Sequence, residues 1–242
     1  MTIHTLKGTS DPRSTIVDPR IMKIHHIIFD WAGTLYDDQH PSYLTSRQVI
    51  KELSGRSLSF EQYRKHFTLP VLPFYRRYGV ELSLDKINEY FFARYQENCF
   101  KGRLFDGVLE ALAYFKKQKI SMSLFSTMDQ KLLKLLCVRL RIHKYFTVIH
   151  GSVCDKTIEL KKHFSRIKKI PEHVLFLGDT DHDIEAANQD GAWSGCVLNG
   201  YQHKARLIKA KPDFVFDDQT QWVPFMRTLT PPVGLGKPGK IK

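Results

Sequence analysis

The sequence predicts a doubly wound α/β fold, in which helices cover both faces of a parallel β-sheet and a helical unit is inserted after the first strand. Three observations support this prediction. Short runs that are apolar on both faces recur along the chain and suit the strands of a buried parallel sheet. Segments with helical spacing separate most of these runs, so that strand and helix alternate. One long stretch, residues 42–104, has several helical patterns and no convincing strand.

The elements of the sheet follow a regular order along the chain. The first expected strand precedes the helical stretch, and the other five follow it. The expected strands are residues 23–29 (KIHHIIF), 120–126 (ISMSLFS), 146–151 (FTVIHG), 173–179 (HVLFLGD), 194–199 (SGCVLN) and 213–217 (DFVFD). The expected helices are residues 108–118, 128–141, 156–168, 183–190 and 203–209. No internal repeat interrupts this alternation.

The helical stretch predicts the domain organisation. We expect residues 42–104 to form a helical cap, and residues 23–41 and 105–228 to form the core domain. In open α/β sheets ligands bind outside the carboxyl ends of the strands, and the inserted unit leaves the sheet there. The cap is therefore expected to act as a lid. The two ends, residues 1–22 and 229–242, are polar or rich in proline, glycine and lysine, and we expect flexible tails.

The composition excludes several classes of protein. Apolar residues make up 42% of the 242 residues, which is enough for a buried core. No stretch approaches the roughly 20 apolar residues of a membrane span, and the N-terminus lacks a signal-peptide pattern, so we expect a cytoplasmic protein without a membrane partner. The net charge of +12 favours anionic partners, but nothing predicts a specific nucleic-acid surface. The cysteines form no CxxC pair, and we expect reduced, partly buried thiols.

Reactive side chains follow several of the expected strands. Asp30 ends the first strand in the string IIFDWAGTLYDD, and an aspartate at a strand tip is a competent nucleophile for phosphoryl groups. Ser126 ends the second strand, and the fourth leads into the acidic string GDTDHD at 178–183, whose oxygen ligands suit Mg²⁺. Lys156 follows the third strand and can offset the negative charge. At one sheet edge these groups predict a phosphoryl-transfer site, where catalysis depends on positioning and charge stabilisation.

The same strings resemble the four ordered motifs of phosphatases of the haloacid dehalogenase (HAD) superfamily. The residues that carry the resemblance are DWAGTL at 30–35, Ser126, Lys156 and GDTDHD at 178–183. The likeness extends over residues 23–217 and is greatest to the phosphoglycolate-phosphatase-like branch. It implies a HAD-like Rossmannoid core with a helical type 1 cap, and a small phosphorylated substrate as the partner of a monomer or homodimer.

The resemblance also implies a role for each matching residue. Asp30 would attack phosphorus and become an aspartyl phosphate, while Ser126 and Lys156 would bind the phosphoryl oxygens. The groups implied as Mg²⁺ ligands are the Asp30 carboxylate, the backbone carbonyl of Ala32, Asp179 and, through a metal-bound water, Asp183. The residues expected to bind substrate are Gly33, Thr34, Thr127 and the cap residue Arg77, whose guanidinium can clamp a carboxylate or a distal phosphate.

Ala32 departs from the pattern of the superfamily. Members that hydrolyse phosphate esters usually have a second aspartate at this position, which protonates the leaving alkoxide and later activates water. General acid and base catalysis of this kind is worth roughly a hundred to ten thousand fold. A methyl group can do neither, so the sequence leaves three functions open.

The first function is a phosphatase that is slow on alkyl esters or restricted to good leaving groups, such as acyl phosphates. The second is a C–P bond hydrolase, because the string DWAGT also resembles phosphonoacetaldehyde hydrolase, which forms a Schiff base on a cap lysine. The cap lysines Lys51, Lys65 and Lys86 have polar neighbours that favour a solvated face instead. The third is a domain that binds a phosphorylated ligand or a protein with little turnover.

Two other conspicuous groups have simpler explanations. His25 and His26 are adjacent in a strand, so they point to opposite faces and cannot share a metal ion. We expect both to be structural. The aromatic residues between 90 and 95 have helical spacing, which predicts packing inside the cap.

Overall fold

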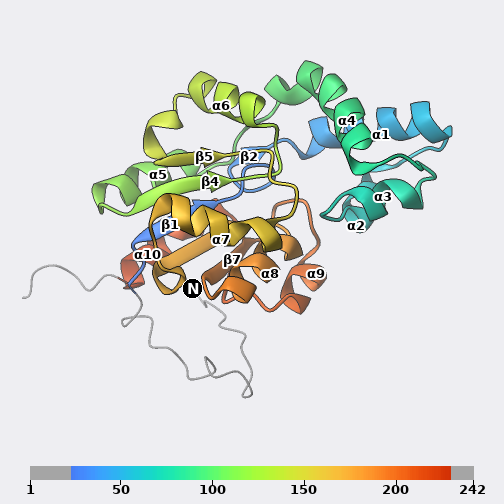
Figure 1. The fold of residues 1–242 in the computed structure, drawn as a ribbon. Helices are drawn as coiled ribbons and strands as arrows, with labels where there is room; N and C mark the ends of the chain where they lie inside the picture. Colours follow the sequence, from blue (N-terminus) through green and yellow to red (C-terminus); the bar gives the residue numbers. More distant parts are fainter. Residues whose placement is uncertain (1–22, 230–242) are drawn as a thin grey trace, which may run out of the picture.

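The computed structural model describes residues 23–229 (Figure 1). The expected tails, residues 1–22 and 229–242, lie outside this range except for Leu229, which ends a helix. The described chain contains a six-stranded parallel sheet with helices on both faces, which confirms the predicted fold class. Each strand of this sheet overlaps one of the six expected runs.

The order of the strands places a switch point beside β1. The strands are β1 (His26–Phe29), β4 (Ser121–Phe125), β5 (Val148–His150), β6 (Val174–Gly178), β7 (Trp193–Val197) and β8 (Phe214–Phe216). In the sheet they lie in the order β5-β4-β1-β6-β7-β8. The chain therefore builds outward from β1 in one direction and then returns to build from β1 in the other. Ligands of open α/β sheets bind at such a point, here between β1 and β6.

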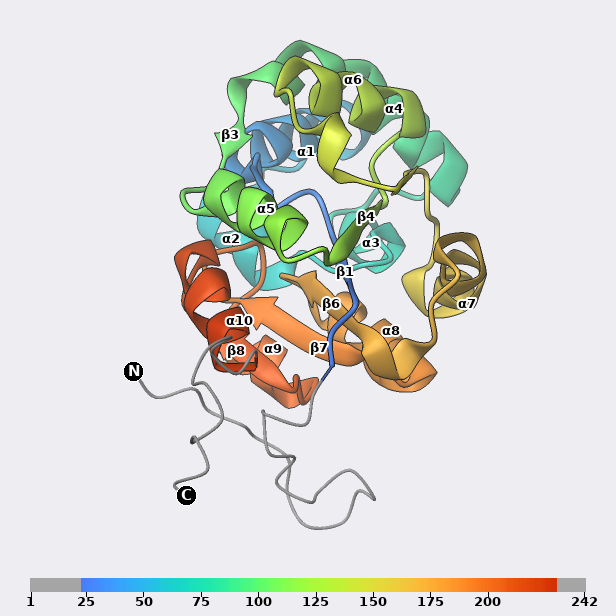
Figure 2. The ribbon, with the colours of Figure 1, turned by 90° about the vertical axis from the view of Figure 1, so that its left-hand side faces the viewer.

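Helices cover the two faces of the sheet, and each strand divides its side chains between them. Ile27 and Phe29 of β1 join an apolar cluster with α5 (Val108–Lys117), α6 (Gln130–Arg139) and α10 (Trp222–Leu229). Ile28 points the other way, into a cluster with α7 (Lys156–Ile167) and α8 (Asp181–Asp190). Figure 2 shows α5 and α10 on one side of the sheet and α7 and α8 on the other. The short helix α9 (Lys204–Lys209) packs Leu207 against α8 and β7.

Three helices begin at the carboxyl edge of the sheet, and a side chain caps each of them. Asp129 caps α6, Asp155 caps α7 and Thr180 caps α8 by accepting hydrogen bonds from backbone N–H groups of the first turn. An N-cap of this kind determines where a helix starts. The caps therefore hold the loops after β4, β5 and β6 in place at this edge.

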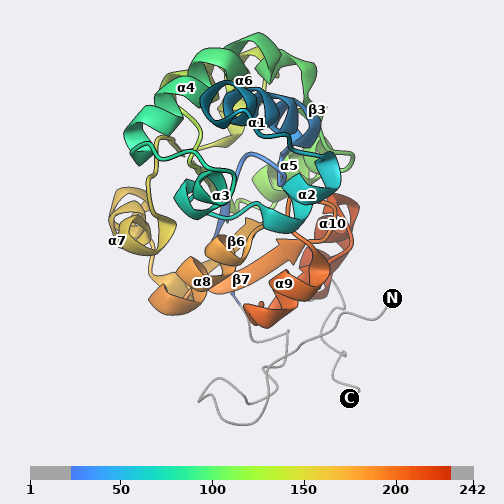
Figure 3. The ribbon, with the colours of Figure 1, turned by 90° about the vertical axis from the view of Figure 1, so that its right-hand side faces the viewer.

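A helical unit lies between the two strands of a small second sheet. The strands are β2 (Tyr36–Asp37) and β3 (Arg103–Leu104), which pair antiparallel. The helices between them are α1 (Gln39–Ser54), α2 (Phe60–His66), α3 (Leu72–Arg77) and α4 (Leu84–Asn98). Figure 1 shows these helices gathered on the side opposite α10, and Figure 3 views the molecule from the side on which they lie. The helical character agrees with the expected cap, whose exact boundaries stay a prediction.

Three elements differ from the expectation: the short strands β2 and β3 and the helix α10. Strand β3 lies within residues 42–104, where we expected no strand, because two residues are too short to show a period of two. Helix α10 was not predicted. Its sequence WVPFMRTL contains Pro224, but the proline stands in the first turn, where it removes no helical hydrogen bond.

The structure also bears on the expectations for the cysteines, for His26 and for membrane-spanning helices. All four cysteines are free, and Cys99, Cys137 and Cys196 are buried, as expected. His26 is buried in β1, with its ring nitrogens 2.7 Å and 2.8 Å from the hydroxyls of Ser121 and Ser123, so its role is structural. Within residues 23–229, no helix combines the length and the apolar character that a bilayer crossing demands.

Candidate active site

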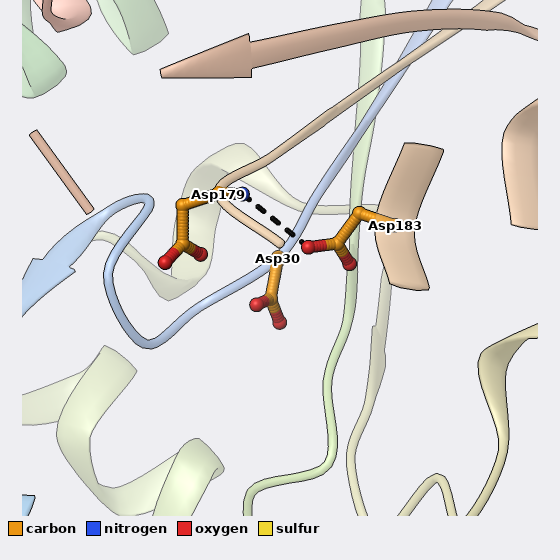
Figure 4. Close-up of side chains that lie close together, drawn as sticks. All are labelled: Asp30, Asp179 and Asp183. Atoms are coloured by element: carbon orange, nitrogen blue, oxygen red, sulfur yellow. Dashed lines mark hydrogen bonds between the residues drawn. The ribbon is translucent and has the colours of Figure 1, made fainter. Parts of the chain in front are cut away.

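The switch point brings two aspartates side by side. Asp30 directly follows β1 and Asp179 directly follows β6, and these strands pair in parallel. Asp183, in the first turn of α8, completes the group: one carboxylate oxygen from each of the three lies within 4.8 Å of the others. Figure 4 shows the three side chains close together, with a hydrogen bond from the backbone of Asp179 to Asp183. Ser126, after β4, and Lys156, at the start of α7, lie at the same edge of the sheet.

Lys156 is the buried cation of this group. Its ammonium lies 2.8 Å from Asp30 Oδ1 and 2.6 Å from Asp183 Oδ1, and its side chain has no exposed surface. Burial by itself lowers the pKa of a lysine, but Asp183 and Asp30 outweigh burial and raise the pKa of Lys156 above its ordinary value. Lys156 is therefore a fixed positive charge between the two carboxylates.

Asp179 is held from several sides. The Thr34 hydroxyl donates to Oδ1 at 2.9 Å, and the backbone N–H of Tyr201 donates to Oδ2 at 2.7 Å. Gly33 and Gly200 pack so closely that a Cβ on either would lie 2.2 Å from an Asp179 atom. The structure therefore places Gly33 and Thr34 behind Asp179. They orient this carboxylate, in place of the substrate contact that we expected from them.

Asp183 shapes the turn after β6. Its Oδ2 accepts hydrogen bonds from the backbone N–H groups of Asp179 and Thr180, at 3.3 and 3.1 Å, and from the Thr180 hydroxyl at 2.6 Å. Its Oδ1 accepts from Lys156. Four donors, one of them the Lys156 ammonium, engage the two oxygens of Asp183, whereas the hydrogen bonds to Asp179 are one on each oxygen. Asp183 therefore suits an orienting role better than direct coordination of a metal, and its action through a metal-bound water stays a prediction.

The charge and chemistry of the cluster fit a divalent cation. Three buried carboxylates face one lysine, which leaves negative charge uncompensated. Burial raises the pKa of Asp30, with Asp183 adding to the effect, and burial together with Asp30 and Asp183 raises that of Asp179. Asp30 Oδ1 accepts no hydrogen bond of ordinary geometry despite the nearby ammonium. Hard oxygen ligands of this kind suit a small divalent cation, which Asp30, Asp179 and the carbonyl of Ala32 would hold.

A cavity of about 310 Å³ opens above Asp30 and Ala32. Its core wall consists of Thr127, Met128, Asp129, Ser152, Val153, Cys154, Thr180 and Tyr201. Its cap wall consists of Asp38, Ser42, Ser46, Tyr63, Phe67, Leu69, Pro70, Val71, Tyr75, Leu84, Asn88, Phe91, Phe92 and Tyr95. The nucleophile candidate thus forms part of the wall of a concave space between core and cap, which is the usual form of a small-molecule site.

The expected substrate contacts differ in their position relative to this cavity. Thr127 lines it, and Ser126 is buried just before Thr127, with its hydroxyl accepting from the Met128 N–H at 3.3 Å. Arg77 does not line it. This arginine is exposed at the end of α3, and Tyr75 is the residue of that helix in the cavity wall, which corrects the expected clamp.

Tyr201, Asp38 and Tyr95 form a connection between core and cap that was not predicted. Tyr201, whose N–H holds Asp179, donates its hydroxyl to Asp38 Oδ1 at 2.8 Å and lies 2.7 Å from the Ser42 hydroxyl. The Tyr95 hydroxyl donates to the other Asp38 oxygen. Only the place of Tyr201 in the loop that follows β7 could have signalled its role. Asp38 and Tyr95 are far apart in the sequence and meet only through the packing of α1 and α4.

A model of the haloacid dehalogenase-like hydrolase family matches residues 27–197. The chain belongs to this family. A phosphoglycolate phosphatase of Salmonella choleraesuis (strain SC-B67) is 29% identical over 128 residues, which are 50% of this chain and 50% of that relative. The chain thus spans about half the length of this relative. The pyrophosphatase PpaX of Bacillus cereus (strain Q1) is 22% identical over 222 residues, 86% of this chain and 99% of the relative.

Solved structures of the HAD-like family have the same fold. A haloacid dehalogenase-like family hydrolase from Streptococcus pneumoniae has a TM-score of 0.72 at 20% identity, covering 84% of this chain and 98% of that chain. CbbY from Rhodobacter sphaeroides, in complex with phosphate, has a TM-score of 0.66 at 18% identity, covering 82% of this chain and 96% of that chain. The family model confirms the expected superfamily and the hydrolase class, and the chain is similar in part to relatives named phosphoglycolate phosphatase.

The close packing of Gly33 against Asp179 predicts a specific effect of Gly33→Ala. Gly33 and Gly55 have positive φ values of 76° and 71°, so alanine is strained at both. Only at Gly33 does the new methyl also meet a neighbour, 2.2 Å from Asp179 Oδ2, whereas nothing lies near it at Gly55. Overpacking costs about 1–3 kcal/mol, so Gly33→Ala should lower the free energy of unfolding by that much more than Gly55→Ala. Urea unfolding measures the free energy of unfolding of both variants. An equal decrease in the two would contradict the close packing of Gly33 against Asp179.

Burial of Asp38 predicts a dependence of stability on pH. Burial raises the pKa of Asp38 from 3.8 to about 6, although Tyr95 and Tyr201 donate to it, and Asp30 adds to the increase. Between these pH values the folded chain holds a proton that the unfolded chain has lost. The contribution of Asp38 to the free energy of unfolding should therefore fall by up to about 3 kcal/mol as pH rises from about 4 to above 6.

The variant Asp38→Asn lacks this titration. The free energy of unfolding of Asp38→Asn minus that of the parent protein should be larger at pH 7.5 than at pH 4.5. Urea unfolding at each pH measures this difference. Asp37→Asn, at the neighbouring and only half-buried position, is the matched control. A difference between Asp38→Asn and the parent that stays constant with pH would argue against a raised pKa at Asp38.

Proposed function

We propose that this HAD-like hydrolase is a Mg²⁺-dependent phosphohydrolase that acts on a small phosphorylated metabolite through an aspartyl phosphate on Asp30. The observation that carries the proposal is the position of Asp30. Its carboxylate stands in the cavity wall, with the buried Lys156 ammonium 2.8 Å away and Asp179 and Asp183 close by. The names of the relatives make phosphoglycolate the first metabolite to test. A cytoplasmic location remains part of the proposal.

The proposed first step forms a bond between an Asp30 oxygen and phosphorus. The bond from phosphorus to the leaving oxygen breaks, and its electron pair leaves with that oxygen. Lys156 keeps the Asp30 carboxylate in one orientation, and the Ser126–Thr127 segment contributes donors to the phosphoryl oxygens. Bound Mg²⁺ would supply positive charge that offsets the charge of the phosphoryl oxygens.

In the second step water attacks the phosphorus of the aspartyl phosphate, which releases inorganic phosphate and restores the Asp30 carboxylate. Ala32 lines the cavity beside Asp30 but cannot give or take a proton. Solvent water must then protonate an alkoxide leaving group. We therefore propose slow turnover of alkyl esters and faster turnover of substrates whose leaving group needs no proton.

The alternative C–P bond hydrolase requires a lysine of the cap at the cavity. Lys51, Lys65 and Lys86 are all exposed, and none of them lines the cavity. Within residues 23–229, Lys156 is the only lysine at the site, and its buried ammonium pairs with Asp30 and Asp183. No observation favours this second function. Measurement of phosphate release also tests the third function, a binding domain without turnover.

Removal of the nucleophile tests the proposed function. Phosphate release from acetyl phosphate, phosphoglycolate and p-nitrophenyl phosphate would be measured with Mg²⁺ and with EDTA. We expect Asp30→Asn to lower the rate at least about a thousandfold, since no covalent intermediate can form, and EDTA to abolish release. Asp106→Asn, at an exposed position, is the control and should retain full activity. Equal release by the parent and Asp30→Asn would disprove an enzymatic role for Asp30.

Replacement of Ala32 tests the proposed limitation on proton transfer. Ala32→Asp should raise kcat for an alkyl ester such as phosphoglycolate by roughly a hundred to ten thousand fold, because the carboxyl can protonate the alkoxide. Release from acetyl phosphate should change far less, since acetate leaves without a proton. Ala32→Asn has the same size but no proton to transfer and should give no increase. A similar response of both variants would mean that proton transfer is not the missing function.

A further inference from the structure

The wall of the cavity is apolar where it meets the part of a substrate beyond the phosphoryl group. The cap contributes aromatic and aliphatic side chains from α2, α3, α4 and the segment Phe67–Val71. Its uncharged polar groups are the hydroxyls of Ser42, Ser46 and the tyrosines, and the amide of Asn88. No lysine, arginine or histidine of residues 23–229 belongs to the wall. The charged side chains that do are acidic: Asp30, Asp38 and Asp129.

Three positively charged side chains near the cavity already pair with acidic residues. The Arg206 guanidinium contacts the Phe67 carbonyl at 3.2 Å but has its Nε on Asp181 at 2.6 Å. Arg94 of α4 pairs with Glu52 and lies over the Tyr90 ring. Lys156 is held between Asp30 and Asp183, at the end of the cavity where phosphoryl transfer takes place. None of these groups is available to a second negative charge on the substrate.

This arrangement discriminates between leaving groups by charge. A carboxylate placed against aromatic side chains loses its hydration without gaining a cation, and Asp38 and Asp129 add repulsion. An uncharged apolar group of similar size gains by burial and by contact with the aromatic rings. The cavity volume of about 310 Å³ leaves room for a group of roughly the size of one aromatic ring beside the phosphoryl group.

We propose that the substrate is a phosphate monoester whose leaving group is uncharged and mainly apolar, about the size of a benzyl group, and that phosphoglycolate is a poor substrate. The proposal rests on the proposed phosphohydrolase function, which it makes specific as to substrate class. Cap side chains such as Phe91, Phe92 and Leu84 determine this preference.

A matched pair of esters tests the proposal. Benzyl phosphate and 4-carboxybenzyl phosphate have alkoxide leaving groups of similar reactivity and differ in one distal charge. Both should react slowly, because Ala32 cannot protonate an alkoxide, so the test compares their relative rates. With Mg²⁺ present, we expect kcat/KM for benzyl phosphate to exceed that for 4-carboxybenzyl phosphate at least tenfold. Calorimetric binding of the two esters to Asp30→Asn should show a preference of the same direction and size, whether or not the parent protein turns them over.

A charge introduced into the wall should weaken the preference. Asn88 lines the cavity from α4, so Asn88→Lys should shift the ratio of the two esters at least tenfold toward 4-carboxybenzyl phosphate. Gln96→Lys adds the same charge to an exposed position of the same helix and should leave the ratio within about twofold. An equal shift by both variants would mean that net charge, and not the cavity wall, sets the ratio, which overturns the proposal.

Turnover and binding together distinguish failure of the substrate class from failure of the hydrolase function. Equal or tighter binding of 4-carboxybenzyl phosphate, or binding of neither ester, overturns the proposed substrate class. Preferred binding of benzyl phosphate, together with no release of phosphate from acetyl phosphate by the parent protein, supports the substrate class and counts against the proposed hydrolase function. Turnover of 4-carboxybenzyl phosphate that exceeds that of benzyl phosphate overturns the substrate class alone.

Discussion

The ion pairs of Lys156 are the interaction on which the rest of the site depends. A lysine without exposed surface is costly to bury, and it is stable here because Asp30 and Asp183 lie within 2.8 Å of its ammonium. Removing either carboxylate would leave a buried charge with less compensation. The pairs also join three separate elements, since Asp30 follows β1, Lys156 begins α7 and Asp183 belongs to the first turn of α8. The nucleophile candidate therefore has a fixed position before any ligand arrives.

A second set of contacts extends from this centre to the cap. Tyr201 uses its backbone for Asp179 and its hydroxyl for Asp38 at the start of the cap segment. Asp38 in turn accepts from Tyr95 of α4. The hydrogen bonds run from the candidate metal ligand to two cap helices, and every member lies close to the cavity. A change of cap position would break them, so the geometry of the acidic cluster and the closed cap support each other.

Two features of the site bear on its chemistry: the alanine at position 32 and the composition of the cavity wall. The missing carboxyl removes a proton donor, and the cap adds no lysine, arginine or histidine that could replace it among residues 23–229. Under the proposed function, the site keeps the charges and positions that phosphoryl transfer requires and lacks a carboxyl at Ala32, while Asp38 in the wall is engaged by Tyr95 and Tyr201. Relatives named phosphoglycolate phosphatase share the fold and part of the sequence, yet the wall of this cavity lacks a cation for a carboxylate. Family membership and substrate are separate questions here.

The sequence by itself determined the sheet, the order of its strands along the chain and the residues at their ends. Apolar runs and helical spacing are local patterns, and the carboxyl ends of parallel strands must meet at one edge, so Asp30, Ser126 and Asp179 could be placed together in advance. Tertiary structure decided which side chains face the cavity. Thr34 turns to Asp179, Arg77 to solvent, and Tyr201 to Asp38, because these directions depend on how the cap helices pack over the sheet. Contacts between residues so far apart in the sequence leave no periodicity for a single sequence to show.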